Sequence, residues 1–420
     1  MFYQTTIKRK NPIFKFWEKC FIQVSQSNIT IKKNSKTDKK LDLITVQPDT
    51  KIEYTTNGGK GQIVIVNGTK KLILLGTGKS KDMLECLIAA RSAKFYSEQI
   101  SLNDFQEIDT LGCGSFGLVK LVQHNTTKKL FALKSVEKNN LYATKAISTI
   151  LSEMRILKTV NHPFLVDLQF AFQNSTHFFL GLEFVPGGDL HNLINRISTI
   201  PLDDAKIYIA EIAIALNYLH SRDILYRDLK PENVLIGRDG HLKLTDFGLS
   251  KDISKFKNTA SFCGTLDYIA PEIVRHLRYS TEVDYYQLGV LTYEMMFKRS
   301  PFPEENRLKK MDSIMCNEPE FPENTNEVLV DLIKGLMNKD PSKRMKYEDI
   351  VAHKFFEGLS FEEVEQKLVQ PSFIPSFETE TDTKYFDKEC EIQETKICIE
   401  DNNLFKEFEY IADDFFFTTK

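Results

Sequence analysis

The chain has 420 residues, 42% of them hydrophobic, which is enough for about two or three domains with sizeable cores. Its 55 Lys and Arg against 58 Asp and Glu give a formal net charge of -3, so no global basic field favours nucleic acid as a partner. The seven cysteines show no paired C-x-x-C spacing, which predicts free thiols in a reducing compartment and argues against a zinc site or a disulfide framework.

The apolar runs of the chain are short. Residues 63–66 and 72–75 have the length of strands and fall far short of a membrane span. The N-terminal residues lack the uninterrupted apolar core of a secretory signal. We therefore expect a cytoplasmic protein.

Residues 1–98 carry short β-rich runs separated by turn signals such as Asn57-Gly58-Gly59. The runs lie at residues 19–24, 29–32, 43–46, 62–66 and 71–75. After Gly78 the apolar residues change to helical spacing behind a cap at Ser80. This pattern predicts a small antiparallel β domain closed by one C-terminal helix.

The rest of the chain divides into three stretches. Residues 105–172 are strand-rich, with one helix expected at 144–159. Helical spacing dominates from residue 190 onward, for example at residues 202–220 and 283–297. Beyond residue 356 the chain is acidic and aromatic, which is typical of a tail that needs a surface to order it.

The first motif with chemical meaning is Gly-x-Gly-x-x-Gly, formed by Gly112, Gly114 and Gly117. Such glycines let backbone N–H groups approach phosphate oxygens that a Cβ atom would obstruct. An isolated motif of this kind also fits a plain turn, and a dinucleotide-binding fold would continue with a helix. Here residues 118–122 have the pattern of another strand, which favours a hairpin that covers phosphate.

Lys134 lies in an apolar strand pattern, where an unpaired charge would be costly. Phosphate oxygens and Glu153, on the following helix, are candidate partners. The alternative is a solvated lysine at a sheet edge, which the motifs further along the chain make less favourable.

Three more motifs follow in order: Tyr-Arg-Asp-Leu-Lys-Pro-Glu-Asn at 226–233, Asp-Phe-Gly at 246–248 and Ala-Pro-Glu at 270–272. This ordered set resembles the eukaryotic protein kinases, and Tyr226, in place of the more common His, resembles the AGC group. The resemblance implies an α+β fold class. The expected architecture is a bilobal protein kinase fold, with a β-rich small lobe and a helical large lobe, preceded by the small antiparallel β domain with its C-terminal helix.

The resemblance implies phosphoryl transfer with ATP and Mg²⁺ as cofactors, a reaction that depends on positioning and charge neutralisation. Asp228 would accept the proton of the substrate hydroxyl, and Lys230 would stabilise the transferred phosphoryl group. Asn233 and Asp246 would hold Mg²⁺. These residues are the predicted catalytic and metal-binding set, together with Lys134.

The resemblance also implies a nucleotide site, in which Lys134 paired with Glu153 anchors the α- and β-phosphates and Leu182 is the gatekeeper. The predicted ATP-binding residues are Leu111, Gly112, Cys113, Gly114, Ser115, Phe116, Gly117, Val119, Ala132, Lys134, Glu153, Glu183, Val185 and Leu235. The apolar members of this set equally fit a plain hydrophobic core.

Four matching positions are expected to be structural. Asp284 and Gly289 stand where the family fixes its catalytic loop, and Glu272 and Arg344 match its buried ion pair. Tyr285 stands where Trp is more usual, a departure that changes packing and leaves the chemistry untouched.

Ser261 directly precedes Phe-Cys-Gly-Thr, and in the AGC kinases an upstream kinase phosphorylates the hydroxyl residue at this position. A phosphate on Ser261 would pair with Arg227, beside Asp228, and so couple loop order to the geometry of the site. Thr259 is a second candidate, and an unmodified polar serine is the alternative.

Lys230 and the Gly264-Thr265 pair resemble Ser/Thr kinases rather than Tyr kinases. Asp189, Glu232 and Glu294 match acidic positions with which basophilic AGC kinases hold arginines before the phosphoacceptor. Each of these acids would individually also fit a solvated surface. The implied function is a Ser/Thr kinase that acts on basic, Arg-containing proteins and is activated at Ser261.

The tail also carries a resemblance. Residues 373–386 resemble the AGC segment that passes the nucleotide, and Phe405, Phe408 and Glu409 resemble its hydrophobic motif. The two phenylalanines would fill a pocket on the small lobe and bias the helix of Glu153 toward Lys134. Glu409 stands where many relatives carry a phosphorylated residue, which predicts a fixed charge and constitutive docking.

Residues 1–98 resemble a pleckstrin-homology domain, with Trp17 at the start of its second strand, and the whole order resembles protein kinase B. The implied domains are residues 1–98, the kinase domain at 105–356 and the tail at 357–420. Phosphoinositide phosphates, and with them the inner face of the plasma membrane, would be contacted by Lys8, Arg9, Lys10 and Lys15.

Glu18 and Cys20 occupy positions where protein kinase B-like domains place arginines, which leaves lipid selectivity open. A β domain that packs on the kinase and holds it shut is the alternative for residues 1–98. For the whole chain, the alternatives to an active kinase are an ATP-binding pseudokinase scaffold and a phosphoinositide-recruited adaptor. Pseudokinases usually lose one of the catalytic residues, whereas Lys134, Asp228 and Asp246 are all present.

Overall fold

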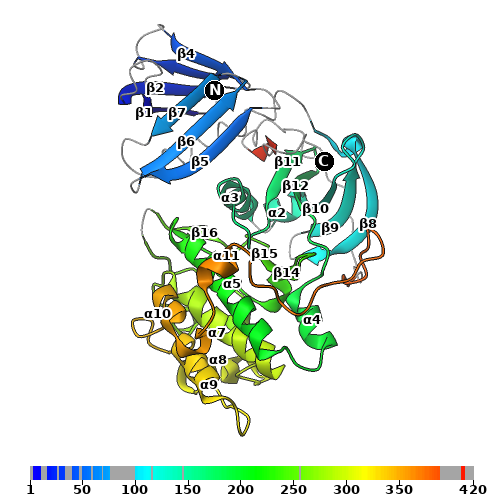
Figure 1. Ribbon diagram of the computed structural model, residues 1–420, viewed down its shortest axis with the longest axis vertical. Coiled ribbons are helices and arrows are strands. Elements are labelled where there is room, and N and C mark those ends of the chain that lie inside the picture. Colours follow the sequence, from blue (N-terminus) through cyan, green and yellow to red (C-terminus); the bar gives the residue numbers. More distant parts are fainter. Residues whose placement is uncertain are drawn as a thin grey trace. The chain divides into compact units, whose positions relative to one another are not determined.

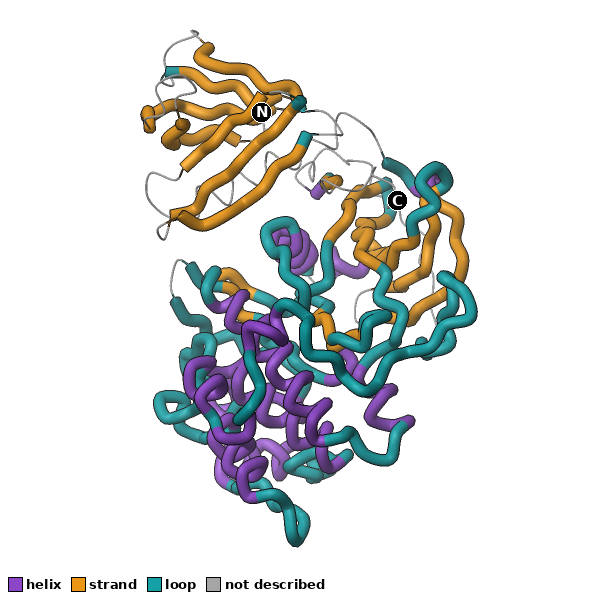
Figure 2. Tube along the Cα trace, in the orientation of Figure 1, coloured by secondary structure: helices purple, strands orange, loops and turns teal. Residues whose placement is uncertain are grey.

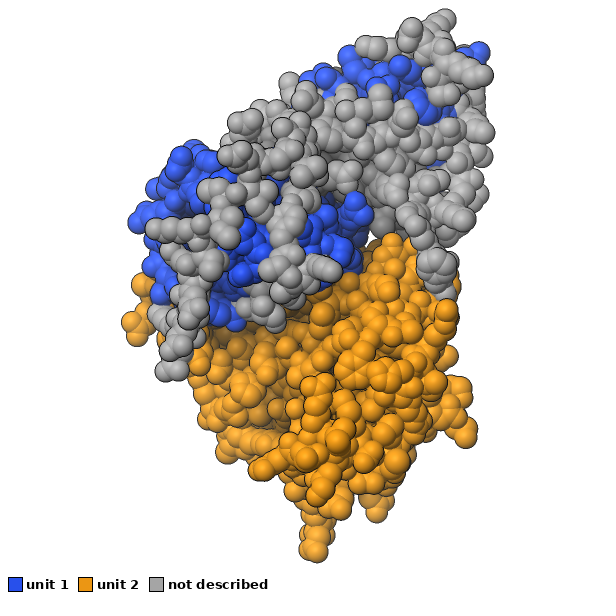
Figure 3. All heavy atoms as spheres, turned by 180° about the vertical axis from the view of Figure 1, so that it is seen from behind, with its two compact units in different colours: residues 1–159, 168–184, 388–420 blue, residues 160–167, 185–387 orange. Residues whose placement is uncertain are grey.

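The computed structural model of the chain is shown in Figure 1. It describes residues 3–10, 17–25, 28–33, 40–46, 50–57, 60–68, 70–75, 100–114, 117–143, 146–254, 257–387 and 408–411. The chain divides into two compact units, residues 1–159, 168–184 and 388–420 in the first and residues 160–167 and 185–387 in the second (Figure 3). Strands dominate the first unit and helices the second (Figure 2).

The first seven strands form one antiparallel sheet in the order β4-β3-β2-β1-β7-β6-β5. They are β1 (Tyr3–Lys10), β2 (Trp17–Ser25), β3 (Asn28–Lys32), β4 (Lys40–Thr45), β5 (Lys51–Asn57), β6 (Lys60–Asn67) and β7 (Lys70–Leu75). The predicted antiparallel β domain is confirmed, and its second strand begins at Trp17 as expected. The C-terminal helix expected after Ser80 lies outside the described residues.

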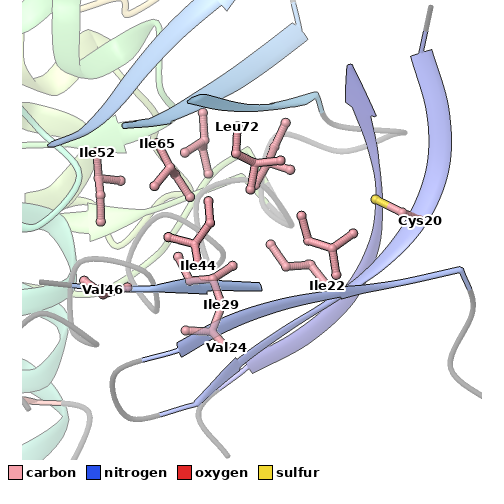
Figure 4. Packing of buried hydrophobic residues seen from close by; sticks show 12 residues of the cluster. Cys20, Ile22, Val24, Ile29, Ile44, Val46, Ile52, Ile65 and Leu72 are labelled. Carbon is pink, nitrogen blue, oxygen red and sulfur yellow. The ribbon is translucent and has the colours of Figure 1, made fainter. Parts of the chain in front are cut away.

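This sheet has a core of its own because alternate residues of its strands turn to one side. In β2, for example, Cys20, Ile22 and Val24 are buried, whereas the residues between them are partly exposed. Figure 4 shows the side chains of several strands meeting. The cluster consists of Cys20, Ile22, Val24, Ile29, Ile31, Ile44, Val46, Ile52, Ile63, Ile65, Leu72 and Leu74.

The second sheet of the first unit has the order β17-β11-β12-β10-β9-β8. Its strands are β8 (Phe105–Gly114), β9 (Gly117–His124), β10 (Leu130–Glu137), β11 (Leu168–Gln173), β12 (His177–Glu183) and β17 (Tyr410–Ile411). The helices of this region are η1 (Leu102–Asp104), α2 (Lys138–Ala143) and α3 (Ile147–Leu157). α3 lies inside the predicted helix 144–159 and ends earlier, while α2 is a separate helix that the spacing did not predict.

Strand β17 comes from the C-terminal tail and pairs with the edge strand β11, so that Phe170 faces Ile411 and Ala171 faces Tyr410 (Figure 1). Ile411 is 1% exposed and belongs to the hydrophobic core of this sheet. The other members of that core are Ile100, Phe105, Val122, Phe131, Leu133, Phe170, Phe172 and Phe179. A segment far along the chain therefore completes the core of the six-stranded sheet.

The second unit is mostly helical. Its longer helices are α4 (Leu190–Arg196), α5 (Leu202–His220), α7 (Glu282–Phe297), α8 (Arg307–Cys316) and α9 (Glu327–Leu336). The shorter ones are η2 (Pro231–Asn233), η3 (Leu266–Tyr268), α6 (Pro271–Val274), α10 (Tyr347–Ala352), η4 (Lys354–Phe356) and α11 (Phe361–Glu365). Two small hairpins pair β13 (Ile224–Leu225) with β16 (Lys251–Asp252) and β14 (Val234–Ile236) with β15 (Leu242–Leu244).

Helices α5 and α7 form the centre of this unit because both are apolar nearly all round. In α5, 13 of 19 residues are buried, and its bounds are those the sequence predicted. Gly289 lets α7 approach α9, since a Cβ there would lie 2.7 Å from Cγ of Met337. Glu272 and Arg344 form the expected buried ion pair, with Nη1–Oε1 and Nη2–Oε2 distances of 2.6 and 2.9 Å.

The first part of the tail belongs to the second unit and is held within it by polar contacts. The backbone N–H of Ser372 donates to Asp204 on α5 at 2.7 Å, and Nε2 of Gln370 lies 3.2 Å from Nε2 of His241. A Cβ at Gly240 would lie 2.4 Å from the carbonyl oxygen of Phe373, so this glycine permits the tail to pass closely.

The cysteines correct one prediction. Cys20, Cys263 and Cys316 are free thiols, as expected. Cys113 is disulfide-bonded, so the prediction of free thiols throughout was wrong at this residue. A spacing rule detects only cysteines that are close in sequence.

In the described part of the chain, no helix has the length and apolar character needed to cross a membrane.

Candidate active site

The glycine motif lies on the hairpin of β8 and β9. Gly112 pairs with Val119, Cys113 with Leu118 and Gly114 with Gly117. Ser115 and Phe116, also predicted to contact ATP, lie outside the described residues. A Cβ at Gly117 would lie 1.8 Å from the carbonyl oxygen of Ser135 on β10. The close approach of two strands is therefore one reason for glycine at 117, independent of any phosphate.

Lys134 and Glu153 form a buried ion pair in the first unit. Nζ of Lys134, on β10, lies 2.7 Å from Oε1 of Glu153, on α3. Their exposed fractions are only 5% and 2%. The partner that Lys134 needs in its apolar strand is thus present, and removal of either partner would leave a buried charge at a cost of about 3–5 kcal/mol.

The other predicted nucleotide residues are distributed over both units. In the first unit, Ala132 on β10 faces Leu182 on β12, and Glu183 is the last residue of that strand. Leu111 is buried on β8. The remaining two, Val185 and Leu235, belong to the second unit.

Asp228 is 8% exposed and has polar contacts to both carboxylate oxygens. Nδ2 of Asn233 donates to Oδ2 and to the backbone oxygen of Asp228, both at 2.8 Å. Nζ of Lys230 lies 3.3 Å from Oδ2, and the hydroxyl of Thr265 donates to Oδ1 at 3.3 Å. The second unit therefore brings Asp228, Lys230 and Asn233 together around one carboxylate.

The hairpin of β14 and β15 brings the two predicted Mg²⁺ ligands near each other. Asn233 directly precedes β14, and Asp246 follows β15 by two residues. The backbone N–H of Thr245 donates to the carbonyl of Asn233 at 3.0 Å. Among the described residues, no group of three or more His, Cys, Asp or Glu could hold a metal ion. One carboxylate with one amide oxygen is a donor set that suits Mg²⁺ when phosphate oxygens complete it.

The backbone around Asp228 is held by side chains of α7. Oδ2 and Oδ1 of Asp284 accept from the backbone N–H groups of Tyr226 and Arg227 at 3.0 and 2.8 Å. His220 lies 2.7 Å from the same carboxylate. Gln287, which the sequence analysis did not single out, bonds the backbone of Arg227 and Leu229.

Ser261 is exposed and lies next to two cations. Nη1 of Arg227 donates to its hydroxyl at 3.3 Å. The hydroxyl of Thr259 is 3.0 Å away and accepts from Nζ of Lys251 at 2.7 Å. Burial lowers the pKa of Lys251, and the charge of Arg227 lowers it further.

The acidic residues Asp189, Glu232 and Glu294 are electrostatically coupled. Asp189 caps α4 by accepting from the N–H of Asn192 at 2.7 Å, and Glu294 accepts from the hydroxyl of Tyr268. Burial raises the pKa of both Asp189 and Glu294, and the charge of Glu232 raises each of them further. The second unit thus gathers the three predicted acids, of which Glu232 is exposed.

Comparison with known proteins gives a family for this arrangement. Residues 105–356 match the family model described as protein kinase domain. The chain belongs to the protein kinase domain family. This kinase domain contains the Lys134–Glu153 pair, Asp228 and its partners, and Asp246.

Several curated relatives are serine/threonine kinases by name. The chain is 37% identical over 324 residues to the rat RAC-beta serine/threonine-protein kinase, covering 76% of this chain and 66% of the relative. It is 38% identical over 298 residues to the Drosophila melanogaster RAC serine/threonine-protein kinase, covering 70% and 49%. A probable serine/threonine-protein kinase of Dictyostelium discoideum is 38% identical over 295 residues, covering 69% and 65%. The chain thus spans slightly less than two thirds of the rat and Dictyostelium relatives and about half of the Drosophila relative.

The predicted hydrophobic motif is described in part. Phe408 is fully buried, and its ring centroid lies 4.6 Å from that of Phe178 on β12. Nζ of Lys158, which caps the C-terminus of α3, donates to the carbonyl of Glu409 at 3.0 Å. Phe405 lies outside the described residues.

Three of the four predicted phosphoinositide residues are described, and only by their backbone. Lys8, Arg9 and Lys10 lie on β1, where Lys8 faces Lys19 of β2. The side chains of all three, and the whole of Lys15, lie outside the described residues. Cys20 is buried in the core of its sheet.

Three residues near the site were missed from the sequence: Lys251, Thr265 in its contact with Asp228, and Gln287. Lys251 follows Asp-Phe-Gly closely, so a cation near a phosphorylation site was a usable signal. Gln287 gave none, because its partners lie 58 and 60 residues away in sequence.

Proposed function

We propose that this chain is a serine/threonine protein kinase that transfers the γ-phosphate of ATP to hydroxyls in Arg-containing proteins. The observation that carries the proposal is the set of contacts around Asp228, whose two oxygens meet Asn233, Lys230 and Thr265. A carboxylate held in this way can orient a hydroxyl and accept its proton.

Asn233 and Asp246 would hold Mg²⁺, which would neutralise charge on the phosphates. The side-chain NH₂ of Asn233 already donates to Asp228, so its amide oxygen would serve as the ligand. Lys230 would stabilise the transferred group, and its ammonium is already held between Asp228 and Thr265.

Lys134 would contact the α- and β-phosphates, with Glu153 fixing its direction. The β8–β9 hairpin, with Gly112, Gly114 and Gly117, would cover the phosphates. The remaining predicted nucleotide residues would surround the ribose and adenine.

We propose that phosphorylation of Ser261 by an upstream kinase activates the protein. A phosphate carries about −1.5 to −2 charges. It would lie beside Arg227 and near Lys251. The positive charges of these two residues are now separated by the hydroxyls of Ser261 and Thr259. Because Arg227 precedes Asp228, ordering this segment would order the site.

Substrate arginines would be held by Asp189, Glu232 and Glu294. Carboxylates pair with guanidinium groups in bidentate fashion. A cationic partner would offset the effects of burial and of the charge of Glu232, which raise the pKa values of Asp189 and Glu294.

In the tail, Phe408 and the fixed charge of Glu409 would keep the hydrophobic motif docked without phosphorylation.

Residues 1–98 would form a pleckstrin-homology-like domain, followed by the kinase domain at 105–356 and the tail at 357–420. The seven-stranded antiparallel sheet with its own core supports this division. Lys8, Arg9, Lys10 and Lys15 would recruit the domain to phosphoinositides. Liposome binding by the full chain tests this role, and indifference to anionic lipid would favour a domain that holds the kinase shut.

The activity is tested by radiolabelled phosphate transfer from Mg·ATP to an Arg-containing Ser peptide. We expect Asp228→Asn to reduce transfer by about 10²–10⁴-fold. Treatment with an upstream kinase that phosphorylates Ser261 should increase transfer by the wild type and leave transfer by Ser261→Ala unchanged. Absence of transfer by the wild type, with and without phosphorylation of Ser261, would favour the alternative of an ATP-binding pseudokinase scaffold.

A further inference from the structure

Gln287 bonds the backbone on both sides of Asp228. It lies on α7 and is 0% exposed. Its Nε2 donates to the carbonyl oxygen of Arg227 at 2.9 Å, and its Oε1 accepts from the N–H of Leu229 at 3.2 Å. One carboxamide therefore spans the residue whose carboxylate is the centre of the site.

The backbone at this point needs support. Arg227 has a φ of +70°, in the left-handed region that residues with a Cβ rarely adopt. Such conformations persist where surrounding contacts over-determine them. Asp284 holds the N–H groups of Tyr226 and Arg227, both before Asp228. Gln287 supplies the contacts that follow, at the carbonyl of Arg227 and the N–H of Leu229.

The chemistry of the position suits a carboxamide. The backbone presents one acceptor and one donor, and the side chain of Gln287 carries a matching NH₂ donor and oxygen acceptor on one carbon. The loop of Gly264 packs against the hydrogen bond between Gln287 and the carbonyl of Arg227. Gly264 has a φ of +107°, and a Cβ there would lie 3.2 Å from the carbonyl oxygen of Arg227 and 3.8 Å from Nε2 of Gln287.

We infer that Gln287 is a positioning residue for Asp228, acting through the backbone of residues 227–229. The inference rests on the proposed kinase function and deepens it. Both described hydrogen bonds of Gln287 go to the backbone on either side of Asp228, so we expect its contribution to be to the rate of transfer rather than to ATP binding. A shift of about 1 Å in a catalytic group can cost about 10²-fold in rate.

Two substitutions separate the polar contacts from packing. Gln287→Met keeps the length and approximate volume but has neither the donor nor the acceptor geometry. Gln287→Glu keeps the acceptor for Leu229, but when ionised it cannot donate to Arg227. We expect both to lower kcat by about 10–100-fold with the KM for ATP within about 2-fold of wild type.

Gln287→Glu also gives a pH signature. Burial raises the pKa of a carboxyl group, and a protonated Glu can again donate to the carbonyl of Arg227. The ratio of kcat for Gln287→Glu to kcat for the wild type should therefore rise as the pH is lowered. A role in packing alone predicts a constant ratio.

Thr292→Val is the matched control, because Thr292 is equally buried on α7 and its hydroxyl bonds only the carbonyl of Leu288 in the same helix among the described contacts. It should retain the kcat of wild type. Circular dichroism and ATP-analogue affinity establish that each variant is folded. A folded Gln287→Met with the kcat of wild type would overturn this inference and leave the proposed kinase function standing. A ratio of kcat for Gln287→Glu to kcat for the wild type that does not change with pH would do the same. Absence of transfer by the wild type would overturn the proposed function, and the inference with it.

Discussion

At the scale of single residues, burial affects the protonation of Asp189 and Glu294, which we propose bind the arginines of the substrate. The pKa values of Asp189 and Glu294 are raised by burial and then by the charge of Glu232. A carboxyl group with a raised pKa gains its proton at a higher pH than an ordinary one, and a neutral carboxyl no longer attracts guanidinium. We therefore expect the KM for an Arg-containing peptide to increase as the pH falls from about 7 to about 5.

Steady-state kinetics with two peptides measures this effect. A peptide without arginine is the control and should show a smaller change in KM. Glu294→Gln should raise the KM of the Arg peptide at neutral pH and weaken its pH dependence. A KM for the Arg peptide that stays flat across this range would contradict the assignment.

Lys251 provides a second prediction at this scale. Its pKa is lowered by burial and by Arg227, so an added phosphate on Ser261 would stabilise its charged form. Lys251→Met should leave the unphosphorylated protein nearly unchanged and reduce the activation by phosphorylation by about 10-fold, as expected for the loss of one charge-assisted hydrogen bond. The control is Lys257→Met, because Lys257 is exposed and pairs with Asp223 instead. Equal activation of both variants and wild type would count against a role for Lys251.

At the scale of elements, β17 is only two residues long, yet it supplies Ile411 to the core of the six-stranded sheet. Truncating a buried isoleucine to alanine costs about 2–5 kcal/mol, and truncation to valine about 0.5–1.5 kcal/mol. We expect Ile411→Ala and Ile411→Val to lower the stability of this region in that order, measured by denaturant unfolding. Unfolding midpoints equal to wild type for both variants would show that the strand contributes little.

The elements also show where the sequence was sufficient. The bounds of α5 followed from its apolar spacing, and the glycine hairpin followed from the strand pattern after Gly117. Asn233 and Asp246 were paired through the family resemblance, and the β14–β15 hairpin lies between them in sequence. β17 could not be predicted, since two residues carry no periodicity and their partner strand lies far away. Gln287 escaped for the same reason, because its partners are not neighbours in the sequence.

At the scale of the whole molecule, the described cores of the two larger sheets share no residue. Among the described residues, none from residues 1–98 belongs to the core that contains Ile411. Deleting residues 1–98 should therefore leave the melting temperature of the kinase portion nearly unchanged, whereas deleting residues 388–420 should lower it by removing Phe408 and Ile411. Calorimetry of the two truncations measures this difference.

The same truncations address the role of the first domain. Phosphate transfer that rises several-fold without residues 1–98 would indicate a domain that holds the kinase shut. Unchanged transfer would indicate that the domain acts in recruitment instead. Loss of folding on deletion of residues 1–98 would contradict the independence of the two cores.

The position of Ile411 also has a consequence for synthesis on the ribosome. Phe179, in the same core, is made 232 residues before Ile411. At about 5–20 residues per second, the free edge of β11 waits roughly 10–50 s for its last strand. An open sheet edge is a template for pairing with other chains. The six-stranded sheet is thus open to misassembly at this edge until Ile411 has been made.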